Sequence, residues 1–186
     1  MRLWHYQLLR GLPRQQLVSQ LRECTAIALD IRNLGKPSNN YLINKINDYP
    51  FDEFKIYCNL VVKEMTRRGY VVKNSTLDKI YECLSKKTSP CVDNKKPIFK
   101  NWHDYAYMDI CFYNLMEKYL CGNITEKEWL DFKEVYFERR TLLNERTERQ
   151  TRGQNEEIRS SGNTKVSSTW VAHSCKDWRQ SISYIY

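Results

Sequence analysis

The sequence predicts an all-α protein, a compact helical single domain followed by a flexible carboxy-terminal tail. Apolar residues recur at spacings of three and four along most of the first 144 residues, which is the period of amphipathic helices. The longest alternating stretch, residues 70–72, is too short to predict a strand. With six glycines and five prolines in 186 residues, the composition excludes collagen-like and wholly disordered chains.

The first two predicted helices cover residues 14–34 and 51–68. In the first, the apolar stripe consists of Leu17, Leu21, Cys24, Ala28 and Ile31. Proline precedes each helix and glycine follows it, which is the usual way helices begin and end. The second helix is expected to bury Phe54, Cys58, Val61, Val62 and Met65.

Three further helices are predicted. Ser75 and Asp78 resemble a capping box that opens a short helix ending near residue 84. A fourth helix is expected from His103 to residue 120, closed by a glycine at 122. Thr125 and Glu128 form a second capping box, which begins a fifth helix that fades near residue 144.

Two segments lack helical periodicity. Residues 85–100 contain five lysines and one aspartate, and they predict a long basic loop. From residue 145 onward the chain is polar and aperiodic. The expected organisation is therefore a helical domain over residues 1–144 and a flexible tail over residues 145–186.

Composition restricts the function further. Thirty Lys and Arg against 22 Asp and Glu give a net charge of +8, which favours a polyanionic partner, although a basic surface can also serve only to keep a protein in solution. No apolar run approaches the roughly 20 residues that a bilayer crossing needs, and the first residues lack a secretory pattern. Seven cysteines without a C-x-x-C pair predict reduced thiols, so we expect a cytoplasmic protein without a membrane partner.

Standard catalytic signatures are absent from the sequence. It contains no dinucleotide-binding glycine motif, P-loop, zinc-protease motif or nucleophile elbow. Three scattered histidines do not predict a metal site, so we expect no metal and no cofactor. On a helical wheel Arg22 and Glu23 face away from the apolar stripe of their helix. Such a pair is usually solvated, but under a covering segment the arginine could hold the carboxylate or bind a phosphate.

The opening residues carry a family resemblance. The stretches MRLWH at 1–5, LPRQQL at 12–17 and QLREC at 20–24 are similar to the start of bacterial proteins related to the phage pyrimidine-dimer DNA glycosylase, also called endonuclease V. The resemblance continues at residues 40–42, over the block 51–70 that ends in RRGY, and at the His103-Asp104 pair. It covers residues 1–120, and the helix after Thr125 and the tail lie outside it.

The resemblance implies a compact endonuclease V type fold whose amino terminus passes between helices, beside a first-helix glutamate that matches Glu23. In this family the α-amine attacks C1′ of a damaged nucleotide, the base leaves, and elimination from the resulting imine cuts the strand. Because a bulky Arg2 generally leaves the initiator in place, the nucleophile would be the Met1 amine, with Glu23 as acid and base. Arg22 would grip a phosphate, and further DNA-binding candidates are Arg2, Arg14, Arg67 and Arg68.

The sequence therefore predicts a DNA repair glycosylase with associated apurinic/apyrimidinic lyase activity on pyrimidine dimers or related damaged bases. Its partner would be damaged double-stranded DNA, and we expect it to act as a monomer. Two alternatives remain. One is a helical DNA-binding protein without catalysis or with another specificity. The other is a helical interaction protein whose basic stretches only keep it in solution.

Overall fold

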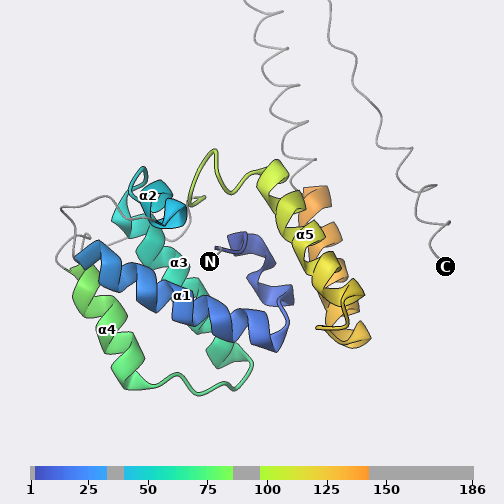
Figure 1. Ribbon diagram of the computed structural model, residues 1–186, viewed down its shortest axis with the longest axis horizontal. Coiled ribbons are helices and arrows are strands. Elements are labelled where there is room, and N and C mark those ends of the chain that lie inside the picture. Colours follow the sequence, from blue (N-terminus) through green and yellow to red (C-terminus); the bar gives the residue numbers. More distant parts are fainter. Residues whose placement is uncertain (1–2, 33–39, 86–96, 143–186) are drawn as a thin grey trace, which may run out of the picture. The chain divides into compact units, whose positions relative to one another are not determined.

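The computed structural model describes residues 3–32, 40–85 and 97–142, and every regular element in these ranges is helical (Figure 1). The elements are η1, a 3-10 helix (Tyr6–Gly11), α1 (Arg14–Arg32), α2 (Tyr41–Ile46), α3 (Phe51–Arg67), α4 (Asn74–Ser85), α5 (Tyr105–Leu120) and a helix over 126–142. The predicted all-α class is confirmed. The chain divides into the units Met1–Arg146 and Thr147–Tyr186, and all described residues belong to the first.

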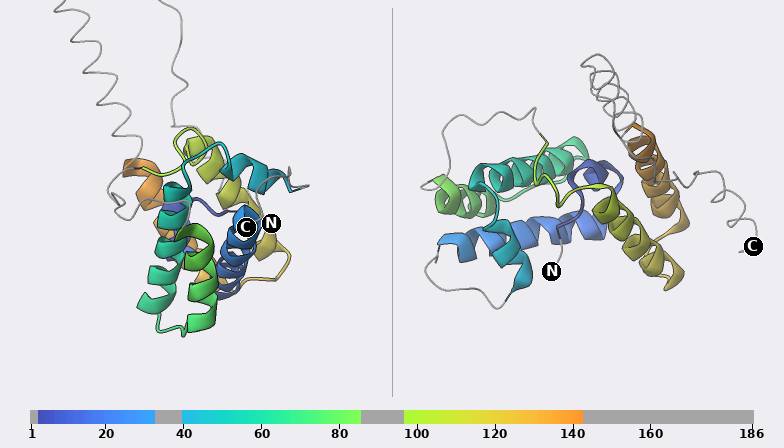
Figure 2. Two further views of the ribbon diagram at one scale, coloured as in Figure 1. Left: turned by 90° about the vertical axis from the view of Figure 1, so that its left-hand side faces the viewer. Right: turned by 90° about the horizontal axis from the view of Figure 1, so that it is seen from above.

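Helix α1 is packed against α3 and α4 and also contacts α2 (Figures 1 and 2). Its predicted apolar stripe is buried, and four of the five side chains have no exposed surface. Of the five residues predicted to be buried in α3, four are buried and Val62 is half-buried. Burial of this kind contributes roughly 25 cal/mol per Å² of apolar surface, so these faces hold α1 and α3 together.

The helix ends follow local sequence signals. Gly69 and Gly122 both have φ of +73°, the left-handed conformation that glycine adopts without a Cβ clash. The amide of Tyr70 donates to the carbonyl of Met65 at 2.9 Å, which closes the last turn of α3. In the second capping box, Thr125 and Glu128 exchange the two expected bonds, from the Glu128 amide to Thr125 Oγ1 and from the Thr125 amide to Glu128 Oε2.

Two predicted helix starts are displaced. The carboxylate of Asp104 accepts from the amide of Tyr107 at 2.9 Å, so α5 begins after Asp104 instead of at His103. Helix α4 begins at Asn74, which places Ser75 inside its first turn instead of at its cap. The short elements η1 and α2 were not predicted, because six residues are too few to establish a helical period.

The helix over 126–142 covers η1 and α5. A Cβ added to Gly11 of η1 would lie 3.0 Å from Val135 Cβ and 3.1 Å from Phe132 Cα. On α5, the ring of Phe112 stacks on Tyr136 with centroids 4.1 Å apart. This helix, which lies outside the resemblance, thus completes the core beside η1 and α5. Most of the predicted basic loop (86–96) and the predicted tail lie outside the described residues.

Candidate active site and nucleic-acid interface

The amino-terminal segment before η1 lies inside the helical domain. Leu3, Trp4 and His5 expose 0%, 6% and 1% of their surface, although they adopt no regular structure. Their backbone groups are bonded to side chains of the surrounding helices: the Tyr57 hydroxyl donates to the Trp4 carbonyl at 2.8 Å, and the Tyr107 hydroxyl donates to the Leu3 carbonyl. A buried irregular segment is stable only when its backbone polar groups find such partners.

Two neutral histidines hold the end of this segment in place where it meets η1. His5 Nε2 lies 2.8 Å from the His103 carbonyl and must donate to it, so His5 Nδ1 accepts from the amide of Gln7 at 3.3 Å. His103 Nδ1 in turn accepts from the amide of Tyr6 at 3.2 Å. Burial lowers the pKa of His5 to about 4 and that of His103 well below its usual value. Both rings are therefore held in the neutral form that these bonds require.

A buried glutamine connects the segment to α1. The amide of Trp4 donates to Gln20 Oε1 at 3.0 Å, and Gln20 Nε2 donates to Glu23 Oε2 across a longer 3.4 Å. Gln20 has no exposed surface, whereas Glu23 is half-buried. One side chain therefore fixes both the fourth residue of the chain and the glutamate that was predicted to be catalytic.

The Glu23 carboxylate borders a polar cavity of about 370 Å³. The cavity lies between the amino-terminal segment, α1 and α5, and its lining consists of Trp4, Gln16, Ser19, Glu23, Asn114, Glu117 and Lys118. Carboxylates, an ammonium group and hydrogen-bonding side chains meet here in partly enclosed space. Such a site can transfer protons to and from a bound group.

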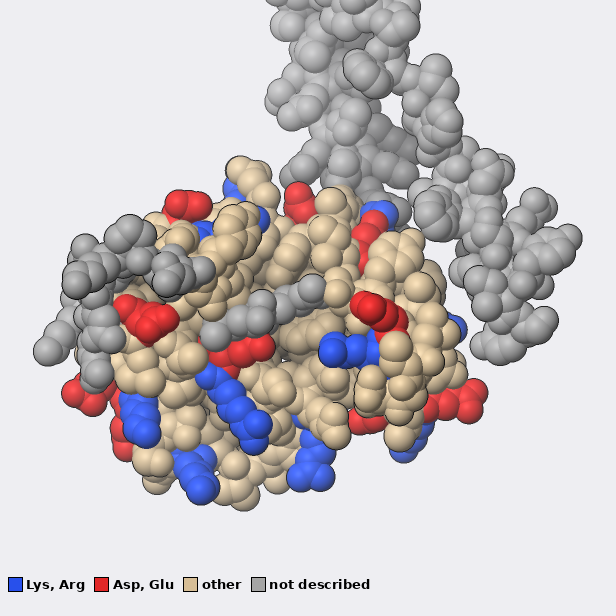
Figure 3. All heavy atoms as spheres, in the orientation of Figure 1, with Lys and Arg blue, Asp and Glu red and all other residues tan. Residues whose placement is uncertain are grey.

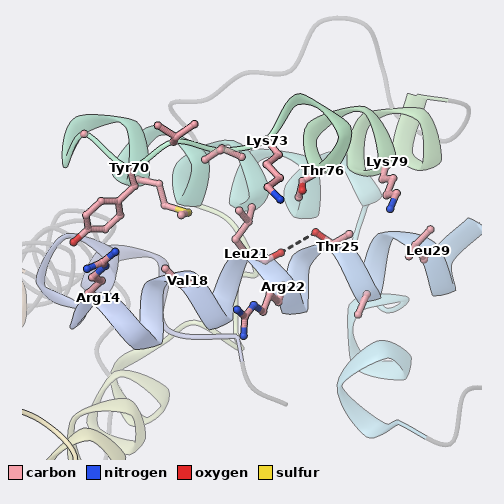
Figure 4. A pocket seen from close by; sticks show the side chains of 15 residues that line it. Arg14, Val18, Leu21, Arg22, Thr25, Leu29, Tyr70, Lys73, Thr76 and Lys79 are labelled. Carbon is pink, nitrogen blue, oxygen red and sulfur yellow. Dashed lines mark hydrogen bonds between the residues drawn. The ribbon is translucent and has the colours of Figure 1, made fainter.

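A larger groove of about 760 Å³ runs along another side of α1, between this helix and the residues from the end of α3 into α4 (Figure 4). Its floor is apolar, and its cationic side chains are Arg14, Arg22, Lys73 and Lys79. Among the described residues that line it, none is acidic. Lys and Arg side chains gather on the corresponding face, over α1, α4 and the segment between α3 and α4 (Figure 3). The groove therefore offers positive charge to a phosphate backbone.

The two arginines at the end of α3 are used differently. Arg68 donates to the carbonyls of Leu9, Arg10 and Leu12 and to Glu64 Oε1, so it is bound to the end of η1. Arg67 also binds Glu64, but its side chain remains 58% exposed. Burial of Glu64 acts to raise its pKa, but hydrogen bonds from both arginines outweigh this effect and lower the pKa.

The predicted site residues thus occupy separate positions. Arg14 and Arg22 share the basic groove, whereas Glu23 lies in the polar cavity on the adjacent side of α1. Met1 and Arg2 lie outside the described residues.

Over the described part of the chain, no three His, Cys, Asp or Glu side chains come together as a metal site. In the same part of the chain, no helix is long and apolar enough to cross a membrane.

Sequence reasoning did not find Gln20, Lys73 or Lys79. Gln20 carried a signal, because it precedes Cys24 by four residues and so lies on the buried stripe, where an amide needs partners. The two lysines carried none, because their proximity to Arg22 depends on how α4 packs against α1.

Comparison with known proteins gives a match that covers the amino-terminal part of this site. No curated protein and no solved structure matches the chain. The predicted resemblance extended to residue 120, whereas the matched region ends at residue 78, within α4. Residues 1–78, which carry the amino-terminal segment and all of α1, match the family model of the pyrimidine dimer DNA glycosylases, and this match confirms the predicted resemblance over these residues.

Proposed function

We propose that the protein is a DNA repair glycosylase with associated apurinic/apyrimidinic lyase activity on pyrimidine dimers or related damaged bases. The observation that carries this proposal is the bonded path from the Trp4 amide through Gln20 to the Glu23 carboxylate. It ties the start of the chain to a half-buried carboxylate beside a polar cavity. The family match over residues 1–78 supports the substrate class.

The proposed nucleophile is the α-amine of Met1. Met1 lies three residues before Trp4, whose amide binds Gln20, and an extended chain of that length spans at most about 11 Å. An α-amine has an ordinary pKa of about 7.7 to 8.0, so a substantial fraction is uncharged and nucleophilic near neutral pH. Its nitrogen would attack C1′ of the damaged nucleotide, and the glycosidic bond would break with its electrons leaving on the base.

Glu23 is proposed to move the protons of this reaction. The carboxylate would accept the proton lost by the attacking amine and would oppose the positive charge that develops on the sugar. The proton held on Glu23 would then pass to O4′ as the C1′–O4′ bond breaks, which opens the sugar ring and gives the protonated imine. The regenerated carboxylate would accept the C2′ proton, and the elimination that follows expels the 3′ phosphate and cuts the strand. The hydrogen bond from Gln20 Nε2 to Glu23 Oε2 orients the carboxylate for these steps.

The basic groove is proposed to hold the DNA backbone. Arg14 and Arg22 lie in it beside Lys73 and Lys79, and phosphate contacts of this kind position a duplex without reading its sequence. Arg2 and the exposed Arg67 remain proposed phosphate contacts. Arg68 is occupied by protein carbonyls, so we propose that it acts on DNA binding through the position of η1.

The proposed catalytic unit is the helical domain over residues 1–144, acting in the cytoplasm as a monomer without a cofactor. Residues 145–186 are proposed to form a flexible tail outside the reaction. Both parts of this proposal can be checked by the activity and the sedimentation of the full chain and of a chain ending at residue 144.

Borohydride trapping tests the proposed chemistry. The purified full chain is reduced on duplex DNA that contains either a cyclobutane pyrimidine dimer or an abasic site, and the cross-linked residue is mapped. We expect a Met1 adduct with both substrates, because borohydride reduces the imine to a stable amine. A chain with one residue added before Met1 serves as a control that should lose cleavage but keep salt-dependent DNA binding. Binding without trapping on either substrate would instead indicate a non-catalytic DNA-binding protein.

A further inference from the structure

A buried amide at the centre of α1 connects the amino-terminal segment to Glu23, but it takes no part itself in the bonds and protons of the proposed reaction. Gln20 has no exposed surface, yet it lies on a helix face whose neighbouring positions are Leu17, Cys24 and Ile27. Burying an amide among apolar side chains is unfavourable unless its hydrogen bonds are made. A polar residue in this position therefore needs an explanation beyond packing.

The two ends of the Gln20 amide have different partners. Its oxygen accepts from the Trp4 amide, and its nitrogen donates to Glu23 Oε2. The oxygen therefore fixes the depth to which the amino-terminal segment enters the domain. The nitrogen places a donor beside one oxygen of the carboxylate. Glutamine is the side chain that provides an acceptor and a donor on one planar group.

We propose that Gln20 is a positioning residue, which sets the separation between the attacking α-amine and the Glu23 carboxylate by binding the segment and the carboxylate at once. This inference rests on the proposed function, and it goes beyond it by assigning the alignment of two reacting groups to one side chain. Misplacing a reacting group by about 1 Å can reduce a rate by about 10²-fold, so the alignment has a measurable effect.

Two substitutions separate the two ends of the amide. Gln20→Leu removes both bonds in a side chain of similar size. Gln20→Glu keeps an acceptor for the Trp4 amide but puts a carboxylate oxygen where the donor to Glu23 was. Ile31→Val, at a fully buried position eleven residues further along α1, is the control for a general loss of stability. Thermal unfolding of all three variants identifies the temperature at which each remains folded.

We expect Gln20→Leu to lower the single-turnover rate of base release by about 10²-fold at a temperature where the variant is folded. Gln20→Glu should move the acidic limb of the pH–rate profile upward by about one pH unit, because a second carboxylate opposes ionisation of Glu23. Ile31→Val should lower the unfolding temperature but leave both the rate and the profile unchanged. A Gln20→Leu variant that loses only thermal stability, as the control does, would overturn the inference.

A measurement without turnover distinguishes this inference from the proposed function. The Glu23 carboxyl group is titrated by carbon NMR in the wild type and in Gln20→Glu, with Glu23→Gln used to assign the signal. We expect the titration midpoint to move to higher pH in Gln20→Glu. An unmoved midpoint would refute the link between Gln20 and Glu23 even if the wild type released bases. A moved midpoint in a protein that neither traps nor releases bases would refute only the proposed function.

Discussion

Glu23 differs from an ordinary surface glutamate in what surrounds it, because it borders the polar cavity and is bound by a fully buried amide. We expect Glu23→Gln to lower base release by at least about 10²-fold, since the variant keeps the size of the side chain but cannot accept a proton. Its affinity for dimer-containing DNA should stay within about threefold, because phosphate contacts dominate binding. Single-turnover assays and fluorescence anisotropy measure the two quantities. Glu82→Gln, at an exposed position of α4, is the control, and full activity in Glu23→Gln would remove Glu23 from the mechanism.

The two histidines make the stability of the domain depend on pH. Because the pKa of folded His5 is about 4 and that of an unfolded histidine about 6.5, the unfolded chain binds the proton first as the pH falls. The contribution of neutral His5 is therefore complete above pH 6.5 and is lost as the pH falls toward 4. We expect this residue to lower the free energy of unfolding by about 3 kcal/mol over that range. Urea unfolding at several pH values measures the loss, and a His5 ring that titrates near pH 6.5 in NMR spectra would contradict it.

At the scale of elements, the contact between η1 and the helix over 126–142 is possible because Gly11 has no side chain. Gly11→Ala would place its Cβ 3.0 Å from Val135 Cβ and 3.1 Å from the Phe132 backbone, so one element must move. We expect a loss of about 1–3 kcal/mol in the free energy of unfolding, measured by urea denaturation. Val135→Gly in the same chain removes the Val135 Cβ and therefore one of the two clashes. If the double variant is no more stable than the sum of the single effects predicts, the clash is not the cause.

Long helices could be predicted from the sequence, and short or irregular elements could not. The stripe on α1 repeats through about four turns, so its period and its buried face are unambiguous. By contrast, the burial of Leu3, Trp4 and His5 results from partners that lie 16 to 106 residues away. A local pattern contains no information about such partners. Glu23 could be recognised because it matches a residue of the family that the sequence resembles. The burial of Gln20 could be predicted from its place on the stripe, but its partner Trp4, and the pairing of His5 with His103, could not.

At the scale of the whole molecule, a net charge of +8 would attract DNA to a particular site only where the cations lie close together on one surface. We expect Arg22→Gln to weaken binding to damaged and undamaged duplexes equally and to reduce the slope of log K against log salt by about one. Anisotropy titrations between low and moderate salt measure the slope. Lys127→Gln, at an exposed position of the helix over 126–142, is the control outside the groove. A loss confined to damaged DNA would instead place Arg22 at the lesion.

The buried amino-terminal segment also imposes an order on folding during synthesis. His5 is synthesised well before its partners, because His103 and Cys111 follow it by 98 and 106 residues. Helices α1, α3 and α4 can associate while the ribosome is still adding α5, but the passage that receives residues 3–5 is not yet complete. Contacts between such distant residues form slowly, because a long loop must close before they are made. Residues 3–5 are therefore synthesised before the helices that enclose them and are among the last to reach their final place.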